Sequence, residues 1–146
     1  MQEKRQDGVT CAILADRNAP LADRLRQLVA SIAGTVFLVA DPRSLLDGAR
    51  RLDPTLLILD LSFADGNAMD LLKALVAEVP DARVVVLSLY DDPTVAEAAM
   101  VQGASAVVLK RSVGDDLLPA IEAVLAGGTF VSPGFRCEHP SGRQSL

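Results

Sequence analysis

The sequence contains no tryptophan, and aromatic residues make up only 3% of it. Proteins that stack on single-stranded nucleic acid depend on aromatic side chains, so a stacking platform is not expected. Positive charge is also in deficit, because 14 lysines and arginines face 19 aspartates and glutamates and leave a net charge of -5. Since a large nucleic-acid footprint needs a basic surface, we expect no direct contact between this chain and nucleic acid.

Histidine and cysteine are scarce, which limits metal and disulfide chemistry. The chain has one histidine and two cysteines, Cys11 within an apolar run and Cys137 near the end. These residues form neither a metal-binding motif nor a disulfide framework.

Long apolar runs are missing as well. No uninterrupted run approaches the roughly 18 residues that a membrane-spanning helix needs. The first eight residues are polar and lack the apolar core of a signal peptide. We therefore expect a cytoplasmic protein without a membrane partner.

Short apolar runs, by contrast, recur along the chain and alternate with segments of helical periodicity. This alternation is typical of βαβ units, and half of the 146 residues are hydrophobic, enough for one domain with a core. We predict an α/β fold of the flavodoxin-like, doubly wound kind, with a five-stranded parallel sheet in the order 2-1-3-4-5 and helices on both faces. The predicted strands are 9–15, 35–40, 56–59, 83–89 and 104–109. Gly34 is expected to end the first helix.

The predicted domain covers residues 9–128. Proline, glycine, serine and charged residues dominate the remainder, so residues 129–146 are interpreted as a tail or the stub of a linker.

Polar residues of complementary chemistry follow four of the predicted strands. Asp16, Asp60, Ser88 and Lys110 stand at or just after the ends of strands one, three, four and five. The binding crevice of an open α/β sheet lies at this edge, so these side chains are expected to converge there. The set suits a carboxylate nucleophile that attacks a phosphoryl group, with an ammonium and a hydroxyl stabilising the transferred oxygens. The plain alternative is that each polar residue simply begins a loop.

Four stretches around these residues resemble response regulator receiver domains of the CheY-like kind. They are ILAD at 13–16, LILDL at 57–61, VLSLYDD at 86–92 and GASAVVLK at 103–110. The stretch AGGTFVSP at 126–133 is similar to the receiver-to-linker junction of the NarL/FixJ (LuxR-type) subclass. The resemblance covers residues 9–132, nearly the whole chain.

The resemblance implies a part in two-component signal transduction. Asp60 would be the phosphoacceptor. It would be phosphorylated by a sensor histidine kinase or a small phosphodonor, with Mg²⁺ bridging. Ser88 would be the switch hydroxyl, Lys110 the ammonium that contacts the phosphoryl group, and Asp16 a member of the acidic pocket. Mg²⁺ would be held by Asp16, Asp60 and the backbone carbonyl of Ser62. The domain would not be an enzyme beyond phosphorylating itself, and its partners would be an output domain or another protein, with a homodimer compatible with the family.

Two positions depart from the family pattern. Arg17 stands where a receiver has its second metal-binding acid, which removes an oxygen ligand and adds a cation, so Mg²⁺ binding should be weakened. The guanidinium either pairs directly with Asp60 or points to solvent. Val107 stands where the family has an aromatic switch residue. The acidic pocket is therefore divergent, and a pseudo-receiver that acts as a phosphorylation-independent interaction module is the alternative interpretation.

A small phosphatase-like α/β domain is the rival from another class. Phosphatases of the haloacid dehalogenase type use a strand-end aspartate but need a second aspartate two residues later, where this chain has Ser62. Only fourteen residues follow Ser132, too few for a helix-turn-helix domain. We therefore expect either a stand-alone receiver or one whose output domain follows outside this sequence.

Overall fold

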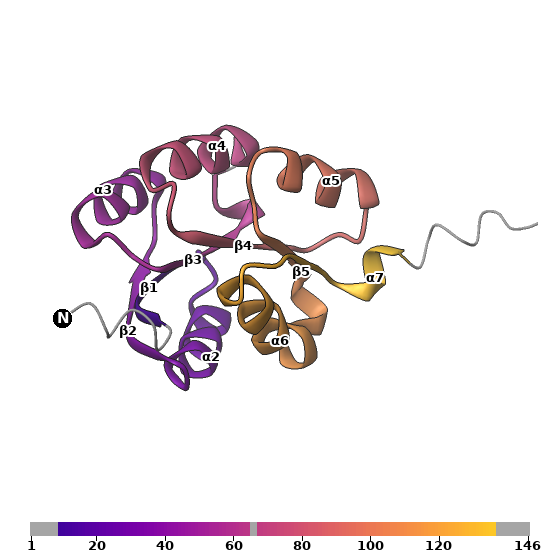
Figure 1. The fold of residues 1–146 in the computed structure, drawn as a ribbon, viewed down its shortest axis with the longest axis horizontal. Helices are drawn as coiled ribbons and strands as arrows, with labels where there is room; N and C mark the ends of the chain where they lie inside the picture. The colour runs from indigo at the N-terminus through magenta and orange to yellow at the C-terminus, as the bar shows by residue number, and fades with distance from the viewer. Residues whose placement is uncertain (1–8, 65–66, 137–146) are drawn as a thin grey trace, which may run out of the picture.

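The computed structural model describes residues 9–64 and 67–136, and in it a parallel sheet lies between two layers of helices (Figure 1). The strands are β1 (Val9–Ala15), β2 (Ala33–Val39), β3 (Leu56–Asp60), β4 (Arg83–Ser88), β5 (Ala106–Leu109) and β6 (Phe130–Val131). The α-helices are α2 (Ala19–Ala30), α3 (Pro42–Leu52), α4 (Ala68–Glu78), α5 (Pro93–Val101), α6 (Val113–Leu125) and α7 (Pro133–Arg136). Two short 3₁₀ turns, η1 (Leu61–Ala64) and η2 (Lys110–Ser112), follow β3 and β5.

The strand order is β2-β1-β3-β4-β5-β6, and every neighbouring pair is parallel. The predicted order 2-1-3-4-5 is confirmed. The prediction of five strands is incomplete, because β6 adds a sixth beside β5. A strand of two residues followed by Ser-Pro-Gly carries too little periodicity to be recognised in a sequence.

Side chains alternate between the two faces of the sheet, which gives the molecule two hydrophobic cores. Helices α3, α4 and α5 cover one face of the sheet, and α2 and α6 cover the other (Figure 1). Ile13 and Ala15 belong to the core on the first face, whereas Ala12 and Leu14 belong to the core on the second. All five residues of β3 are buried. The nearly continuous apolar runs therefore reflect burial on both faces, as parallel strands require.

Local signals set the helix starts. The side chains of Asn18, Asp41 and Asp92 each accept a hydrogen bond from a backbone N–H in the first turn of α2, α3 and α5. These caps satisfy amides that have no partner within the helix, and a proline in the first turn pre-sets the backbone.

The expected boundary between the first helix and the second strand is wrong by a few residues. Helix α2 ends at Ala30 rather than near Gly34, and β2 begins at Ala33 rather than at 35. The hydroxyl and the N–H of Ser31 both donate to the Leu28 carbonyl and close the helix early. Gly34 then lies within β2, which pairs with β1 from Val9 and Ala33 onward.

Residues 130–136, expected to belong to a tail, are part of the fold. Ser132 is fully buried, and Phe135 of α7 is 2% exposed within the core under α5. Residues 137–146, which include Cys137, lie outside the described residues. The folded unit thus extends beyond the expected boundary at 128.

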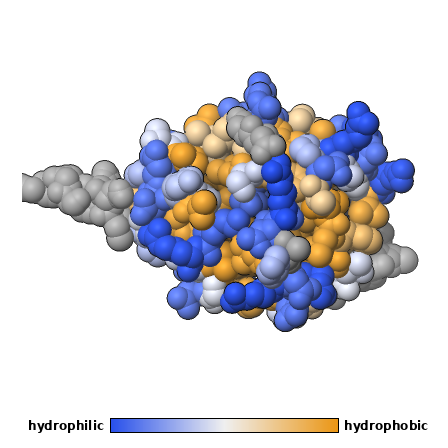
Figure 2. Space-filling view, turned by 180° about the vertical axis from the view of Figure 1, so that it is seen from behind, coloured by the Kyte–Doolittle hydropathy of each residue, from blue (hydrophilic) through white to orange (hydrophobic). Residues whose placement is uncertain are grey.

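Hydrophobic side chains also reach the surface, as the view from behind shows between hydrophilic regions (Figure 2). The large exposed ones include Phe37 and Leu38 on the edge strand β2, and Leu89 and Tyr90 after β4. Within the described residues, no helix is long and apolar enough to cross a membrane.

Candidate functional site

Asp16, Asp60, Ser88 and Lys110 all lie at the carboxyl edge of the sheet. Asp60 and Ser88 are the last residues of β3 and β4, and Asp16 and Lys110 directly follow β1 and β5. The strands are parallel and adjacent, so their ends meet at one edge.

Asp60 is a buried carboxylate with several donors around it. Its side chain is 2% exposed, and its Oδ2 lies 2.8 Å from the Lys110 ammonium. The Ser62 hydroxyl also donates to Oδ2 at 2.8 Å, and the Ser62 backbone N–H donates to Oδ1 at 3.2 Å. A buried charge is tolerated when it is paired and hydrogen-bonded in this way.

Asp16 is buried as deeply but is less well compensated. Its Oδ1 accepts from the Asn18 N–H at 2.9 Å, whereas its Oδ2 is buried without a hydrogen-bond partner and lies 3.9 Å from the Lys110 Nζ. Burial raises the pKa of Asp16 most, and the negative charge of Asp60 adds to this, against the lowering effects of the Asn18 N–H and of Lys110. The Lys110 ammonium thus lies beside both buried carboxylates.

Ser88 is buried at the same edge, but its hydroxyl is bonded elsewhere. It donates to the Tyr90 carbonyl at 2.7 Å, within the loop that follows β4. Among the described residues, the hydrogen bonds to Asp60 come from Ser62 and Lys110. The structure therefore joins Asp16, Asp60 and Lys110, and leaves Ser88 turned to its own loop.

The two divergent positions lie in different surroundings. Arg17 is exposed, and the Lys110 ammonium lies 3.9 Å from Asp16 Oδ2 and 2.8 Å from Asp60 Oδ2. Val107 is fully buried in β5 and lies in the same core cluster as Phe135.

Sequence reasoning missed two hydroxyls that matter at this edge. The first is the Ser62 side chain, since only its backbone carbonyl was considered. The second is Ser132, which accepts from the Leu109 N–H at 3.0 Å and donates to Asp116 Oδ2 at 2.7 Å. A serine in a stretch rich in proline and glycine gives no signal of such a position, although the flanking Phe130 and Phe135 could have indicated buried chain.

The carboxylates of Asp16 and Asp60, which lie beside the same ammonium, supply oxygens of the kind that a divalent cation binds. The buried, unpartnered Oδ2 of Asp16 beside a second carboxylate is the kind of oxygen that a cation satisfies. Mg²⁺ in proteins commonly uses one or two carboxylates and keeps several waters. No cluster of three or more His, Cys, Asp or Glu side chains suited to a metal occurs in the described part of the chain, where the site offers two carboxylates.

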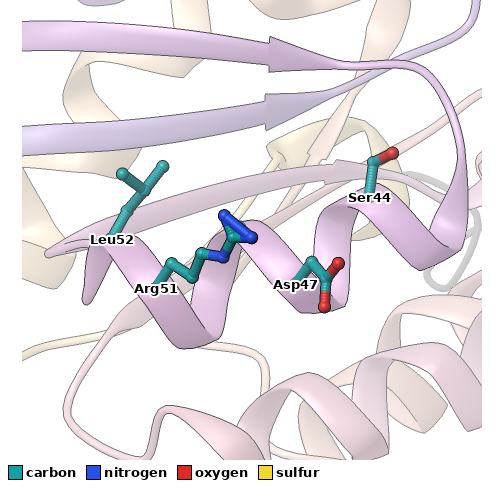
Figure 3. A pocket seen from close by; sticks show the side chains of 5 residues that line it. Ser44, Asp47, Arg51 and Leu52 are labelled. Carbon is teal, nitrogen blue, oxygen red and sulfur yellow. The ribbon is translucent and has the colours of Figure 1, made fainter.

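A surface depression also lies on α3, lined by Ser44, Asp47, Gly48, Arg51 and Leu52 (Figure 3). All of its lining residues come from this one helix, and none is a member of the Asp60 site. It therefore has no part in the chemistry at the strand ends.

Comparison with known proteins gives one consistent family. The family model of the response regulator receiver domain matches residues 12–122. The transcriptional regulatory protein MctR of Rhizobium johnstonii is 28% identical over 127 residues, which cover 84% of this chain and 58% of MctR. The DNA-binding transcriptional activator DevR/DosR of Mycobacterium tuberculosis is 31% identical over 100 residues, which cover 68% of this chain and 45% of that protein. The chain spans about half the length of these curated relatives.

Solved structures support the fold. A two-component response regulator of the LuxR family from Aurantimonas sp. SI85-9A1 superposes with a TM-score of 0.82 at 24% identity, covering 93% of this chain and 98% of that one. The isolated receiver domain of RcsB from Salmonella enterica serovar Typhimurium, in its apo form, gives a TM-score of 0.76 at 24% identity and covers 88% and 97% of the two chains. At this identity the likeness concerns the fold alone.

Proposed function

The chain belongs to the response regulator receiver domain family of two-component systems, and from this premise we propose that Asp60 is its phosphoacceptor. The observation that carries the proposal is the buried Asp60 carboxylate at the end of β3, held 2.8 Å from the Lys110 ammonium. The negative charge of the phosphoryl group would change the contacts that the domain makes with other proteins.

The proposed chemistry is a single transfer to the protein itself. An oxygen of the Asp60 carboxylate forms a bond to phosphorus while the bond from phosphorus to the donor breaks, and the donor's leaving group keeps the electron pair. The donor is a phosphohistidine of a sensor kinase or a small acyl phosphate. Lys110 faces the negative charge of the transferred oxygens, and the Ser62 N–H already points at the carboxylate.

Mg²⁺ would be held by Asp16, Asp60 and the Ser62 carbonyl, and when bound it would neutralise charge on the transferred phosphoryl oxygens. Arg17 follows Asp16 directly and brings a positive charge where an acidic side chain would add an oxygen ligand. We propose that binding of the ion is weakened for this reason, and that phosphorylation is slowed with it.

Ser88 supplies the proposed link from the site to the surface. Its hydroxyl donates to the Tyr90 carbonyl, and Leu89 and Tyr90 are 57% and 70% exposed. A phosphoryl group on Asp60 offers the hydroxyl new acceptor oxygens, so Ser88 would release Tyr90 and let this loop move. The recipient would be an output domain or a separate partner protein.

A pseudo-receiver is the second candidate, and Arg17 and Val107 favour it. In that case the fold acts as an interaction module without phosphorylation. A phosphatase has less support, because Ser62 stands where its second aspartate would be, and the Ser62 hydroxyl donates to Asp60.

Acetyl phosphate with Mg²⁺, followed by intact-mass measurement, tests the phosphoacceptor. We expect one added phosphoryl group on the wild type, formed slowly, and none on Asp60→Asn. Arg17→Asp should speed the reaction about tenfold or more, because it restores a carboxylate at the metal. Arg24→Asp makes the same change of charge at an exposed position of α2 and should leave the rate unchanged.

Each result separates the candidates. An adduct that persists in Asp60→Asn would remove Asp60 from the proposal. A wild type that stays unmodified while Arg17→Asp is modified identifies a pseudo-receiver whose pocket is disabled by Arg17. If neither the wild type nor Arg17→Asp gains a phosphoryl group, and Arg17→Asp also fails to bind beryllofluoride, then phosphoryl acceptance by this fold is excluded.

A further inference from the structure

The C-terminal segment 130–136 is tied to the site by one buried serine. Ser132 is fully buried, and its hydroxyl makes two hydrogen bonds, accepting from the Leu109 N–H and donating to the Asp116 carboxylate. Its own N–H donates to the Val107 carbonyl at 2.9 Å. Ser132 therefore joins β5, the first turn of α6 and the C-terminal segment at a single point.

That point lies one residue from the ammonium that binds Asp60. Leu109 directly precedes Lys110. The register between β5 and β6 ends at the pair Val107 and Val131, so the Leu109 N–H donates to the Ser132 hydroxyl instead of to a carbonyl of β6. The segment also packs on the Leu109 side chain, since a Cβ at Gly134 would collide with Leu109 Cδ1. Phe135 lies in the same core cluster as Leu109.

We propose that Ser132 is a positioning residue for the Asp60 site, which fixes the turn after β5 so that Lys110 reaches the buried carboxylates. Without the hydroxyl, the Leu109 N–H and the Asp116 carboxylate each lose a partner, and the turn is free to shift. Lys110 then loses its 2.8 Å contact with Asp60. The consequence for phosphorylation rests on the proposed function, whereas the position of Lys110 does not.

The coupling also acts in the opposite direction. If Lys110 follows a phosphoryl group on Asp60, the Leu109 N–H moves with it and the bond to Ser132 is loosened. Coupling between two sites is reciprocal. If docking of segment 130–136 affects the Asp60 site, then phosphorylation of that site must in turn affect how tightly the segment docks.

Trace labelling of amines with acetic anhydride, read by peptide mass spectrometry, measures the position of Lys110. The other lysines are Lys4 and Lys73, and Lys73 is exposed on α4, so the labelling ratio of Lys110 to Lys73 is an internal measure. In Ser132→Ala this ratio should rise severalfold, because the ammonium is released from Asp60. Asp116→Ala should raise it less, since it leaves the hydroxyl to accept from Leu109.

Two controls separate positioning from a general loss of stability. Ser132→Thr keeps a hydroxyl and should restore the wild-type ratio. Val29→Ala opens a cavity in the other core, under α2, and should lower stability without changing the ratio.

The acetyl phosphate reaction supplies the second measurement, and the two can fail separately. If the wild type is phosphorylated, Ser132→Ala should react about tenfold more slowly, because an ammonium facing the transferred oxygens is displaced. A raised labelling ratio with no phosphorylation of any variant would sink the proposed function and leave the positioning role of Ser132 in place. An unchanged ratio in a folded Ser132→Ala, or an equal rise in Val29→Ala, would overturn the positioning role.

Discussion

The balance of charge at single residues explains the electrostatics of the site. Asp16 and Asp60 are both buried, and Lys110 is the cation that pairs with each of them, at 3.9 and 2.8 Å. The shorter contact and both Ser62 donors go to Asp60. The burial of the Asp16 carboxylate is therefore less well compensated by nearby donors than that of Asp60, which agrees with the raised pKa of Asp16 and its unpartnered Oδ2.

Replacing Asp16 by asparagine should stabilise the protein at neutral pH, because it removes the cost of burying this charged carboxylate. The folded-state pKa of Asp16 lies above the ordinary value of 3.8. A group of this kind favours the folded state fully below pH 3.8 and loses that contribution as the pH rises through its folded pKa. The advantage of Asp16→Asn should therefore shrink as the pH falls toward 3.8, which urea denaturation at several pH values would measure.

Asp41 provides a control of opposite sign. Hydrogen bonds from the Ser44 N–H and hydroxyl lower the pKa of this exposed cap of α3. Its contribution is present above the ordinary pKa and is lost as the pH falls through the folded value. Asp41→Ala should be less stable than the wild type at neutral pH, with a deficit that closes in acid. The same pH trend for both variants would contradict the assignment for Asp16.

At the scale of elements, the short connections between helices and strands hold the strand ends in place. The loop after α5 reverses direction at Gly103, whose φ is +113°. A Cβ at this position would lie 2.9 Å from Cγ1 of Val76 in α4. Glycine is needed there both for the backbone and for the approach of α4, and this loop leads directly into β5, which positions Lys110.

A pair of glycine substitutions tests this element. Gly103→Ala should lower the free energy of unfolding by about 2 kcal/mol, because a residue with a Cβ is strained at this φ and contacts Val76. Gly114→Ala, in the first turn of α6 with no atom within 4 Å of the added Cβ, should raise it by about 0.5 kcal/mol. Equal effects of the two substitutions in chemical denaturation would show that neither backbone strain nor Val76 matters at 103.

At the scale of the whole molecule, the parts that could be predicted are those with a periodic signal. Strands such as β3 are buried at every position because both faces are covered, and their runs of apolar residues make β1 to β5 recognisable in the sequence. The position of Asp16, Asp60 and Lys110 at one edge follows in turn from parallel strands. Strand β6 and helix α7 are too short for any period and are held by burial of Phe135 and Ser132.

Details of the site that depend on side-chain rotation could not be predicted. The sequence places Ser88 at the end of β4 but does not tell whether its hydroxyl turns to Asp60 or to the Tyr90 carbonyl, as it does here. The same holds for Arg17, whose two expected orientations differ by rotations about single bonds. The unpaired Oδ2 of Asp16 depends on how one ammonium is shared, which only the folded arrangement decides.

Two shortened chains test where the folded unit ends. A chain ending at 136 keeps every described contact and should unfold as the full chain does. A chain ending at 128 loses Phe135, which is 2% exposed, and fully buried Ser132. Its free energy of unfolding should fall by about 3 kcal/mol or more, since deletion of one buried phenylalanine side chain alone costs that much. Equal urea midpoints for the two chains would show that the folded unit ends at 128 and that segment 130–136 does not contribute to its stability. The expected loss would show that this segment is a structural part of the domain, bonded to the residue that precedes Lys110.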